Sequence, residues 1–242
     1  MASSAGKERT HCIRCGDCCR KSSPTLQMAD LPRVKDGFIQ RADLYTIRTG
    51  EPVRDTIRGG IKETDHECIK IRETSGGCVY FDGSQNACRI YGHRPVQCAA
   101  QQCWDEREFM RVYAEPRATR RDLITNPNLL KVIEAHERRC GISEMERWIR
   151  RIDHRGETAI APILKMLRFD HDLREMMPER LRMDPGELDL ILGRPLRHII
   201  EGFGLRVLNE TNGSFFLTVK NGDASGTSDD IPTPHLRTEI PS

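Results

Sequence analysis

The sequence has no long apolar run and little apolar content of any kind. Hydrophobic residues make up 37% of the 242 residues and aromatic residues only 5%. No stretch approaches the roughly 20 apolar residues that span a bilayer, and the opening MASSAGKERTHC lacks the apolar segment of a signal peptide. These absences predict a cytoplasmic protein without a membrane partner. They also predict that something besides apolar burial, such as a metal, stabilises part of the chain.

Neither sign of charge is in excess. The chain has 38 basic and 36 acidic residues, for a net charge of +2. A protein that binds nucleic acid usually carries a strong basic footprint, so we expect no nucleic-acid partner. The interspersed charges are typical of a solvated surface.

The common catalytic motifs are missing as well. The sequence contains no GxxxxGK[ST], HExxH or GxSxG motif, and no Gly-rich loop between a strand and a helix that would bind a nucleotide cofactor. A dithiol redox role for Cys12 and Cys15 would need a thioredoxin-like βαβ context, which the sequence does not indicate. No catalytic residue is therefore predicted.

Cysteine is absent from the last 102 residues (242 − 140) and abundant before them. All ten cysteines lie between Cys12 and Cys140. A reducing compartment disfavours a disulfide framework, so we expect thiols that bind metal or take part in redox chemistry. The chain thus divides into a thiol-rich part and a part without thiols.

The segment CIRCGDCC carries Cys12, Cys15, Cys18 and Cys19 within eight residues. The C-x2-C-x2-C spacing matches the first three ligands of the bacterial ferredoxin run for a [4Fe–4S] cluster. The x3-C-P continuation is missing, so a fourth ligand would come from elsewhere. Cys-x2-Cys pairs are equally the unit of tetrahedral zinc sites. Adjacent cysteines point in different directions, so Cys18 and Cys19 can serve different centres.

A second group begins about 60 residues later in the chain. Cys78, Cys88 and Cys98 are separated by two equal gaps of nine residues, and Cys103 follows closely. The isolated Cys68 and Cys140 are expected to be small buried apolar residues. His136, one helical turn before Cys140, is either a further zinc ligand or, as is more common for such a histidine, a surface or packing residue. His11 and His93 flank the cysteine motifs and are weaker candidates as ligands or supports of a metal centre. The ligand prediction rests on the cysteines. The predicted metal ligands are Cys12, Cys15, Cys18, Cys19, Cys78, Cys88, Cys98 and Cys103.

These two motifs together resemble the YkgJ-type CxxCxxCC cysteine-cluster family of zinc- or iron-chelating proteins. The family pattern continues with a Cys-x-aromatic-aromatic segment and C-x-I-Y-x-x-R-P-x-x-C. The resemblance covers about residues 10–105 and implies nothing about the helices that follow. Beyond the four cysteines of the first motif, the matching residues are Cys78, Tyr80, Phe81, Cys88, Ile90, Tyr91, Arg94, Pro95 and Cys98.

Both zinc and an iron–sulfur cluster accept four thiolates, and the loop with a remote fourth cysteine favours the cluster. The prediction is a [4Fe–4S] cluster held by Cys12, Cys15, Cys18 and one of Cys78, Cys88 and Cys98, in an accessory or electron-transfer role. A structural zinc scaffold is one alternative. Another alternative, a cluster-dependent protein lysine methylase, follows from the resemblance. The same domain occurs in flagellin lysine N-methylases, which are thought to use S-adenosylmethionine. Whether the protein is an enzyme stays open.

The apolar pattern predicts a fold that is mainly α with short β elements. Residues 38–49 are expected to form a helix that ends at Gly50, and Pro95 to start a helix that runs through Cys98 and Cys103. Short strands are expected at residues 69–72 and 79–81. Helical periodicity returns at residues 128–139, 145–152, 157–168 and 187–192, and residues 205–210 and 214–220 flank an Asn-Gly hairpin turn.

The expected organisation is an irregular, metal-stabilised cysteine-cluster domain followed by helices. The cluster domain takes residues 12–140, and a helical region with a terminal β-hairpin takes residues 141–220. The polar residues 1–11 and 221–242 are expected to be disordered. The helical region is the expected surface for a protein partner.

Overall fold

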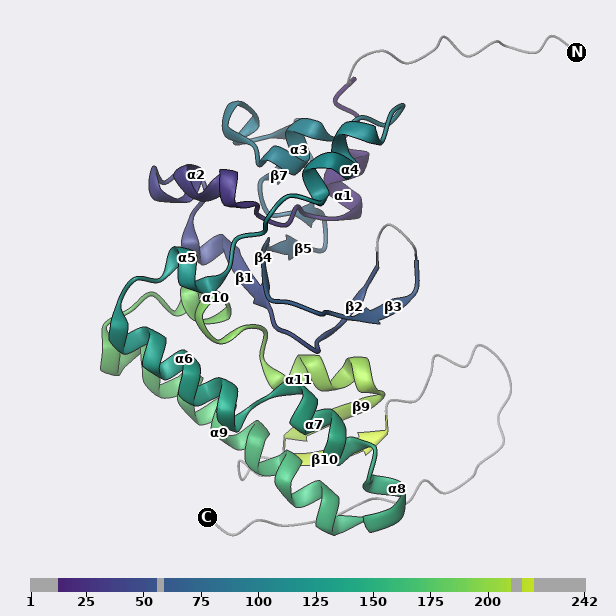
Figure 1. The fold of residues 1–242 in the computed structure, drawn as a ribbon, viewed down its shortest axis with the longest axis vertical. Coiled ribbons are helices and arrows are strands. Elements are labelled where there is room, and N and C mark those ends of the chain that lie inside the picture. The colour runs from purple at the N-terminus through teal and green to yellow at the C-terminus, as the bar shows by residue number, and fades with distance from the viewer. Residues whose placement is uncertain (1–12, 56–58, 210–214, 220–242) are drawn as a thin grey trace, which may run out of the picture. The chain divides into compact units, whose positions relative to one another are not determined.

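The computed structural model describes residues 13–55, 59–209 and 215–219 (Figure 1). About 51% of these residues are helical, with short antiparallel strand pairs, which confirms a fold that is mainly α with short β elements. The predicted disordered ends, the Asn-Gly turn and the first cysteine, Cys12, lie outside the described residues. The chain forms two compact units. Unit 1 comprises residues 1–45 and 68–123, and unit 2 comprises residues 46–67 and 124–242.

Unit 1 contains the cysteine motifs and consists of short elements. Its backbone is organised by the extended segment 24–28, which pairs with two others. The Leu26 N–H donates to the carbonyl of Ile69 at 2.8 Å, and Ala118 N–H donates to the carbonyl of Leu26 at 3.0 Å. Its elements are α1 (Asp17–Lys21), η1 (Met28–Asp30), α2 (Leu31–Lys35), η2 (Arg41–Asp43), β4 (Cys68–Ile71), β5 (Glu73–Thr74), β6 (Gly77–Cys78), β7 (Phe81–Asp82), β8 (Ala87–Cys88), η3 (Tyr91–His93), α3 (Val96–Ala100), α4 (Arg107–Tyr113) and α5 (Arg120–Leu123).

Strand β1 (Leu44–Ile47) pairs with β4 and continues the chain from unit 1 into unit 2. This strand replaces the helix predicted for residues 38–49, of which only the single turn η2 forms. Tyr45, Thr46 and Ile47 are aromatic or β-branched and suit a pleated strand, and Leu44 and Ile47 are buried. The apolar residues therefore serve a strand whose partner, β4, is distant in sequence.

The helix predicted from Pro95 is also interrupted. It ends at Ala100, and α4 begins only at Arg107. In between, the Asp105 carboxylate accepts the backbone N–H of Arg107 at 3.0 Å and starts the second helix. Cys103 therefore lies in the connection rather than on a helix. The strand predicted at residues 79–81 is divided too, because β6 ends at Cys78 and β7 begins at Phe81.

Unit 2 is built around the 25-residue helix α9 (Glu157–Leu181). Among the described residues no helix is both long and apolar enough to cross a membrane. The helices predicted at residues 128–139, 157–168 and 187–192 are confirmed, with α9 longer than expected. The helix predicted at residues 145–152 is divided, because α7 ends at Ile149 and Ile152 begins α8. The other elements are β2 (Pro52–Arg54), β3 (Ile61–Glu63), α6 (Pro127–Arg139), α7 (Ile142–Ile149), α8 (Ile152–Arg155), η4 (Pro185–Glu187), α10 (Leu188–Leu192), α11 (Leu196–Ile199), η5 (Ile200–Phe203), β9 (Leu205–Asn209) and β10 (Phe215–Val219).

The core of unit 2 joins α7, α9 and α11 to the terminal hairpin. Met145, Ile163, Leu196 and Leu217 are buried members of one apolar cluster, each from a different element. The predicted hairpin is confirmed, because β9 and β10 pair antiparallel with Leu217 opposite Val207. Unit 2 thus has a conventional apolar core.

A buried polar network accompanies this core. Arg48 is 1% exposed, and its Nη2 donates to Glu137 at 2.8 Å and to the carbonyl of Cys140 at 2.6 Å. Gly193 makes room for it, because a Cβ there would lie 2.5 Å from the Arg48 Cδ. Arg48 thereby ties segment 46–67 to the end of α6.

Candidate metal centre

The predicted ligands lie on separate short elements of unit 1. Cys15 precedes α1, which carries Cys18 and Cys19, while Cys78 lies in β6 and Cys88 in β8. Cys98 is on α3, and Cys103 is exposed in the connection after it. Cys12 lies outside the described residues.

Two glycines let the first motif approach the second. At Gly77, with φ +104°, a Cβ would lie 2.3 Å from the carbonyl oxygen of Cys19 and 2.6 Å from the Cα of Arg20. At Gly16, with φ +79°, a Cβ would lie 2.4 Å from the ring of Phe81. Both positions combine a left-handed backbone with a close approach, which only glycine accommodates without strain. Helix α1 therefore packs directly on the segment that carries Cys78.

Five thiols from the two motifs interact with one another. The pKa of Cys18 is lowered to about 6, chiefly because its thiolate accepts a hydrogen bond from the Cys19 thiol. The pKa of Cys19 is raised by that same hydrogen bond, by burial, and by the charges of Cys18, Cys98 and Cys78. Cys18 is therefore the more acidic thiol of this adjacent pair, and the charges of Cys78 and Cys98, from the second motif, act on Cys19.

The second motif shows the same mutual repulsion. Burial raises the pKa of Cys98, and the charges of Cys78, Cys88 and Cys18 raise it further. Burial likewise raises the pKa of Cys78, with a contribution from Cys88. We call the five thiols of Cys18, Cys19, Cys78, Cys88 and Cys98 the thiol cluster.

The donor set of the thiol cluster fits a metal that prefers sulfur. Several thiolates close together repel one another, and a bound cation offsets that repulsion and lowers the pKa of each ligand. Zinc and iron–sulfur centres are the usual occupants of such sites. Among the described residues, however, no three His, Cys, Asp or Glu side chains stand in the arrangement that one metal ion requires. The thiols are gathered, but side-chain movement would be needed to complete a coordination sphere.

Aromatic residues of the second motif contact arginines from both motifs. The guanidinium groups of Arg14 and Arg94 lie 4.3 Å and 4.0 Å from the centre of the Tyr91 ring. The guanidinium of Arg20 lies 4.8 Å from the centre of the Phe81 ring. Such cation–π contacts stabilise the junction of the two motifs, which gives the aromatic residues of the pattern a structural role.

Two further residues support the site: Tyr80, which belongs to the family pattern, and Asp30, which had no recognisable signal in the sequence. The hydroxyl of Tyr80 accepts the backbone N–H of Gln40 at 2.8 Å, which fixes the strand end beside Cys78. The buried Asp30 accepts the N–H of Val96 at 2.9 Å, at the first residue of α3. A carboxylate at a helix N-terminus is stabilising, so Asp30 holds the helix that carries Cys98.

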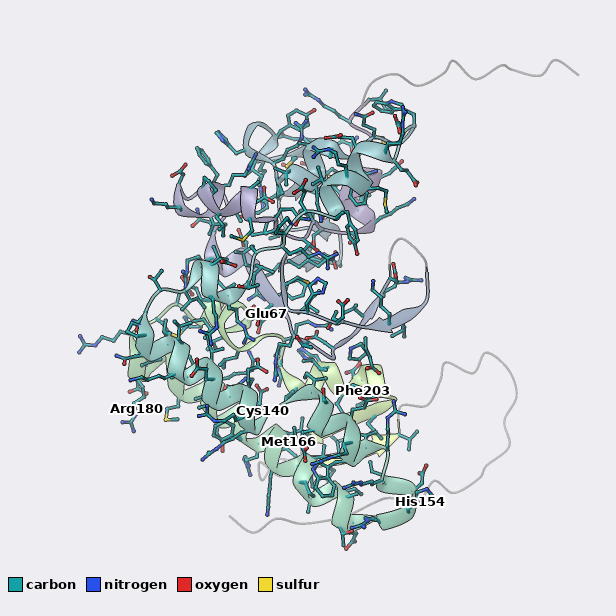
Figure 2. All side chains as sticks on the ribbon, viewed as in Figure 1. Glu67, Cys140, His154, Met166, Arg180 and Phe203 are labelled. Atoms are coloured by element: carbon teal, nitrogen blue, oxygen red, sulfur yellow. The ribbon has the colours of Figure 1, made fainter. Side chains whose placement is uncertain are left out.

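Cys68 and Cys140 are not members of the thiol cluster. Cys68 is buried in β4 and Cys140 is buried in unit 2, as expected of small apolar residues. The Sγ of Cys140 lies 3.6 Å from the carbonyl oxygen of Met166, and both residues are labelled in Figure 2. Burial raises the pKa of Cys140 to about 12, so it is not an activated nucleophile.

His136 and His93 have partners other than the thiol cluster. His136 Nε2 lies 2.8 Å from the Asp170 carboxylate inside unit 2, which confirms a packing role. His93 stacks on Phe38 with ring centres 3.4 Å apart. His11 lies outside the described residues.

Comparison with known proteins agrees with this site. No curated protein and no solved structure is detectably similar to the chain. One protein-family model does match, and its match ends before the helices of unit 2 begin. Residues 11–116 match the model of the CxxCxxCC family, described as a "putative zinc- or iron-chelating domain", which confirms the resemblance that the two cysteine motifs indicated.

Proposed function

We propose that the matched segment holds an iron–sulfur cluster in an accessory or electron-transfer role. The observation that carries the proposal is that α1, with Cys18 and Cys19, packs directly on the backbone of Gly77 beside Cys78, so that the two cysteine motifs meet. The proposed ligands are the thiolates of Cys12, Cys15 and Cys18 with one thiolate of the second motif. When bound, the cluster supplies reversible one-electron chemistry, and the protein supplies ligands, charge and shelter from solvent.

The spacing of the first motif favours an iron–sulfur cluster over a single zinc ion. Zinc and a [4Fe–4S] cluster each take four thiolates, so the number of thiols does not separate them. The C-x2-C-x2-C run supplies three ligands from one loop, as in the bacterial ferredoxin motif, and leaves the fourth to a distant cysteine. Cys19 and the unused thiols of the second motif then serve as neighbours of the cluster or as ligands of a second centre.

A zinc scaffold is the second candidate function. Cys78 is buried, and Cys19, Cys88 and Cys98 are partly buried, which suits the closed, fully protein-ligated sites of structural zinc. In that role the domain would stabilise a binding surface without redox chemistry.

Elemental analysis and an optical spectrum of protein purified without oxygen distinguish these functions. We expect roughly four irons per chain with acid-labile sulfide and broad visible absorption, as a [4Fe–4S] cluster requires. One or two zinc ions in a colourless sample would establish the zinc scaffold instead. Protein with neither metal, before and after reconstitution, would contradict both.

Single cysteine variants test the ligand assignment. We expect Cys15→Ala to lower the metal content, because it removes a proposed ligand. Cys68→Ala, which removes a buried thiol of β4 outside the thiol cluster, should leave the metal content unchanged. Equal metal content in the two variants would refute the assignment.

A further inference from the structure

We propose that Asn86 and Arg20 are positioning residues that hold the first cysteine motif in place for metal binding. This inference rests on the proposed function and concerns residues that are not themselves ligands. The two side chains connect the turn before β8 to the loop between Cys12 and Cys18.

Asn86 binds the loop from one side. Its Nδ2 donates to the carbonyl oxygen of Arg14 at 2.9 Å, and its Oδ1 accepts from Nη2 of Arg20 at 2.7 Å. The side chain thus uses its donor and its acceptor on the same loop and helix, 66 to 72 residues away in sequence. Such a pair of hydrogen bonds fixes both the position and the orientation of the amide.

Arg20 completes the connection. Its Nη1 donates to the carbonyl oxygen of Cys15 at 2.8 Å, and its guanidinium lies over the ring of Phe81. The hydrogen bonds therefore run from the carbonyl of Arg14 through Asn86 and Arg20 to the carbonyl of Cys15. We call this chain of contacts the amide clasp. It fixes two consecutive carbonyl groups in the middle of the C-x2-C-x2-C loop.

The backbone around the clasp is specialised for it. Asn86 has φ +52°, a left-handed conformation that asparagine tolerates better than most residues. A Cβ on Gly16 would lie 2.7 Å from the Asn86 Oδ1. The loop can therefore reach the amide only because residue 16 has no side chain.

The clasp matters because the thiols are gathered without being arranged for coordination. A loop with fixed carbonyl groups limits where the thiolates of Cys15 and Cys18 can go, so less entropy is lost when the metal binds. Residues that orient metal ligands in this way typically change the metal affinity by roughly 10- to 100-fold when they are replaced.

The most informative variant is Asn86→Gly. Glycine accepts φ +52° without strain, so the variant removes the amide and leaves the backbone conformation available. Gln85→Gly is the matched control, because Gln85 is the neighbouring exposed amide of the same turn and its backbone N–H bond to Asp82 is retained. Arg20→Lys keeps the charge but loses the planar fork that reaches two acceptors.

Two measurements on the full chain test the clasp. The first is amide hydrogen exchange of residues 14–20 in metal-free protein, which we expect to be faster in Asn86→Gly than in wild type or Gln85→Gly. The second is the affinity for Zn²⁺ by chelator competition, with the Co²⁺–thiolate absorption spectrum as a report on ligand geometry. We expect Asn86→Gly to bind Zn²⁺ roughly 10- to 100-fold more weakly and to show an altered Co²⁺ spectrum, with Arg20→Lys between it and wild type.

The outcomes separate this inference from the proposed function. Wild-type protein that binds no Zn²⁺, Co²⁺ or iron–sulfur cluster would overturn the proposed function, while the exchange measurement would still decide whether the clasp holds the loop. Wild-type protein that binds metal as tightly as Asn86→Gly, with the same Co²⁺ spectrum, would overturn the positioning role. Equal losses in Asn86→Gly and Gln85→Gly would also overturn it, because a general loosening of the turn would then explain both.

Discussion

At Gly77 the backbone of α1 lies so close to strand β6 that no side chain fits between them. The atoms that a Cβ would meet, the carbonyl oxygen of Cys19 and the Cα of Arg20, belong to the main chain and cannot rotate away. The contact joins the two cysteine motifs at residues directly adjacent to their thiols. The lack of a side chain at residue 77 therefore allows the two cysteine motifs to lie in contact.

Replacing this glycine should separate the motifs. We expect Gly77→Ala to lower the free energy of unfolding of unit 1 by roughly 1–3 kcal/mol or more, because it adds a clash to a left-handed backbone, and to lower the metal content. Gly76→Ala is the control, because a Cβ at Gly76 has only the Thr74 hydroxyl nearby, at 3.7 Å. Urea unfolding and metal analysis measure both effects, and equal stability of the two variants would contradict the structural role of Gly77.

Residues differ in how much of their role is visible in the sequence. The cysteines could be predicted as ligands because metal chemistry imposes a spacing that survives without any knowledge of the fold. Asn86, Asp30 and Gly77 could not, because each acts on a segment distant in the chain. The DGSQN sequence indicates only a turn, and nothing in it names Arg14 or Arg20 as the partner of the amide.

Helices of unit 2 were predictable because each one has an apolar face that the rest of the unit covers. The helix predicted at residues 38–49 does not form, for an identifiable reason. Over so short a stretch the apolar pattern of these residues is compatible with the period of a helix and with that of a strand. Pairing with β4, which lies beyond the intervening residues 48–67, selects the strand. Elements that depend on a distant partner are the ones that sequence periodicity misses.

The contact between α6 and α9 makes unit 2 sensitive to pH. His136 of α6 is buried against Asp170 of α9, with Arg48 and Glu137 nearby. Burial lowers the pKa of His136, despite the hydrogen bond to Asp170. The carboxylate of Asp170 also accepts the Leu196 N–H at 3.0 Å and the Nε of Arg174 at 3.1 Å. The pair therefore joins three elements of the unit.

We expect unit 2 to lose stability as the pH falls from about 7 towards 5.5. The unfolded histidine, with a pKa of about 6.5, takes up a proton in this range that the native one resists, so acid favours the unfolded state. His136→Gln should be less stable at pH 7 and show a flatter pH dependence. Urea midpoints across this pH range, followed by the fluorescence of Trp148, measure the effect. If the urea midpoint of His136→Gln changed with pH as steeply as that of the wild type, groups other than His136 would cause the loss of stability in acid.

At the scale of the whole molecule, the two units are built differently. Unit 2 has a continuous apolar cluster, whereas unit 1 is made of strands of two to four residues and short helices, with Leu26, Ile69 and Ile71 among its buried apolar residues. The lean composition is consistent with a unit 1 that relies on a metal for part of its folding free energy. Amino-acid composition does not say which distant segments pack together. It therefore could not show that segment 46–67 packs with helices that follow residue 124.

Metal removal should therefore destabilise one unit only. We expect metal-free protein to show an earlier thermal transition for unit 1 and an unchanged transition for unit 2. The two tryptophans report separately, since Trp104 lies in unit 1 and Trp148 in unit 2, so Trp148→Phe and Trp104→Phe variants isolate each signal. A common shift of both transitions would contradict independent sources of stability.

The interleaved chain also has a consequence during synthesis on the ribosome. All of unit 1 has been synthesised once residue 123 is translated, and it leaves the exit tunnel while the later helices are still being made, so we expect it to fold first. The contact of Thr46 forms much later, because its hydroxyl donates to the carbonyl of Leu190, 144 residues further along. Until then Arg48 and Glu51 belong to a tethered segment with no partners from the later chain. A chain that stops after residue 123 would therefore contain all of unit 1 and a segment 46–67 without its packing partners in unit 2.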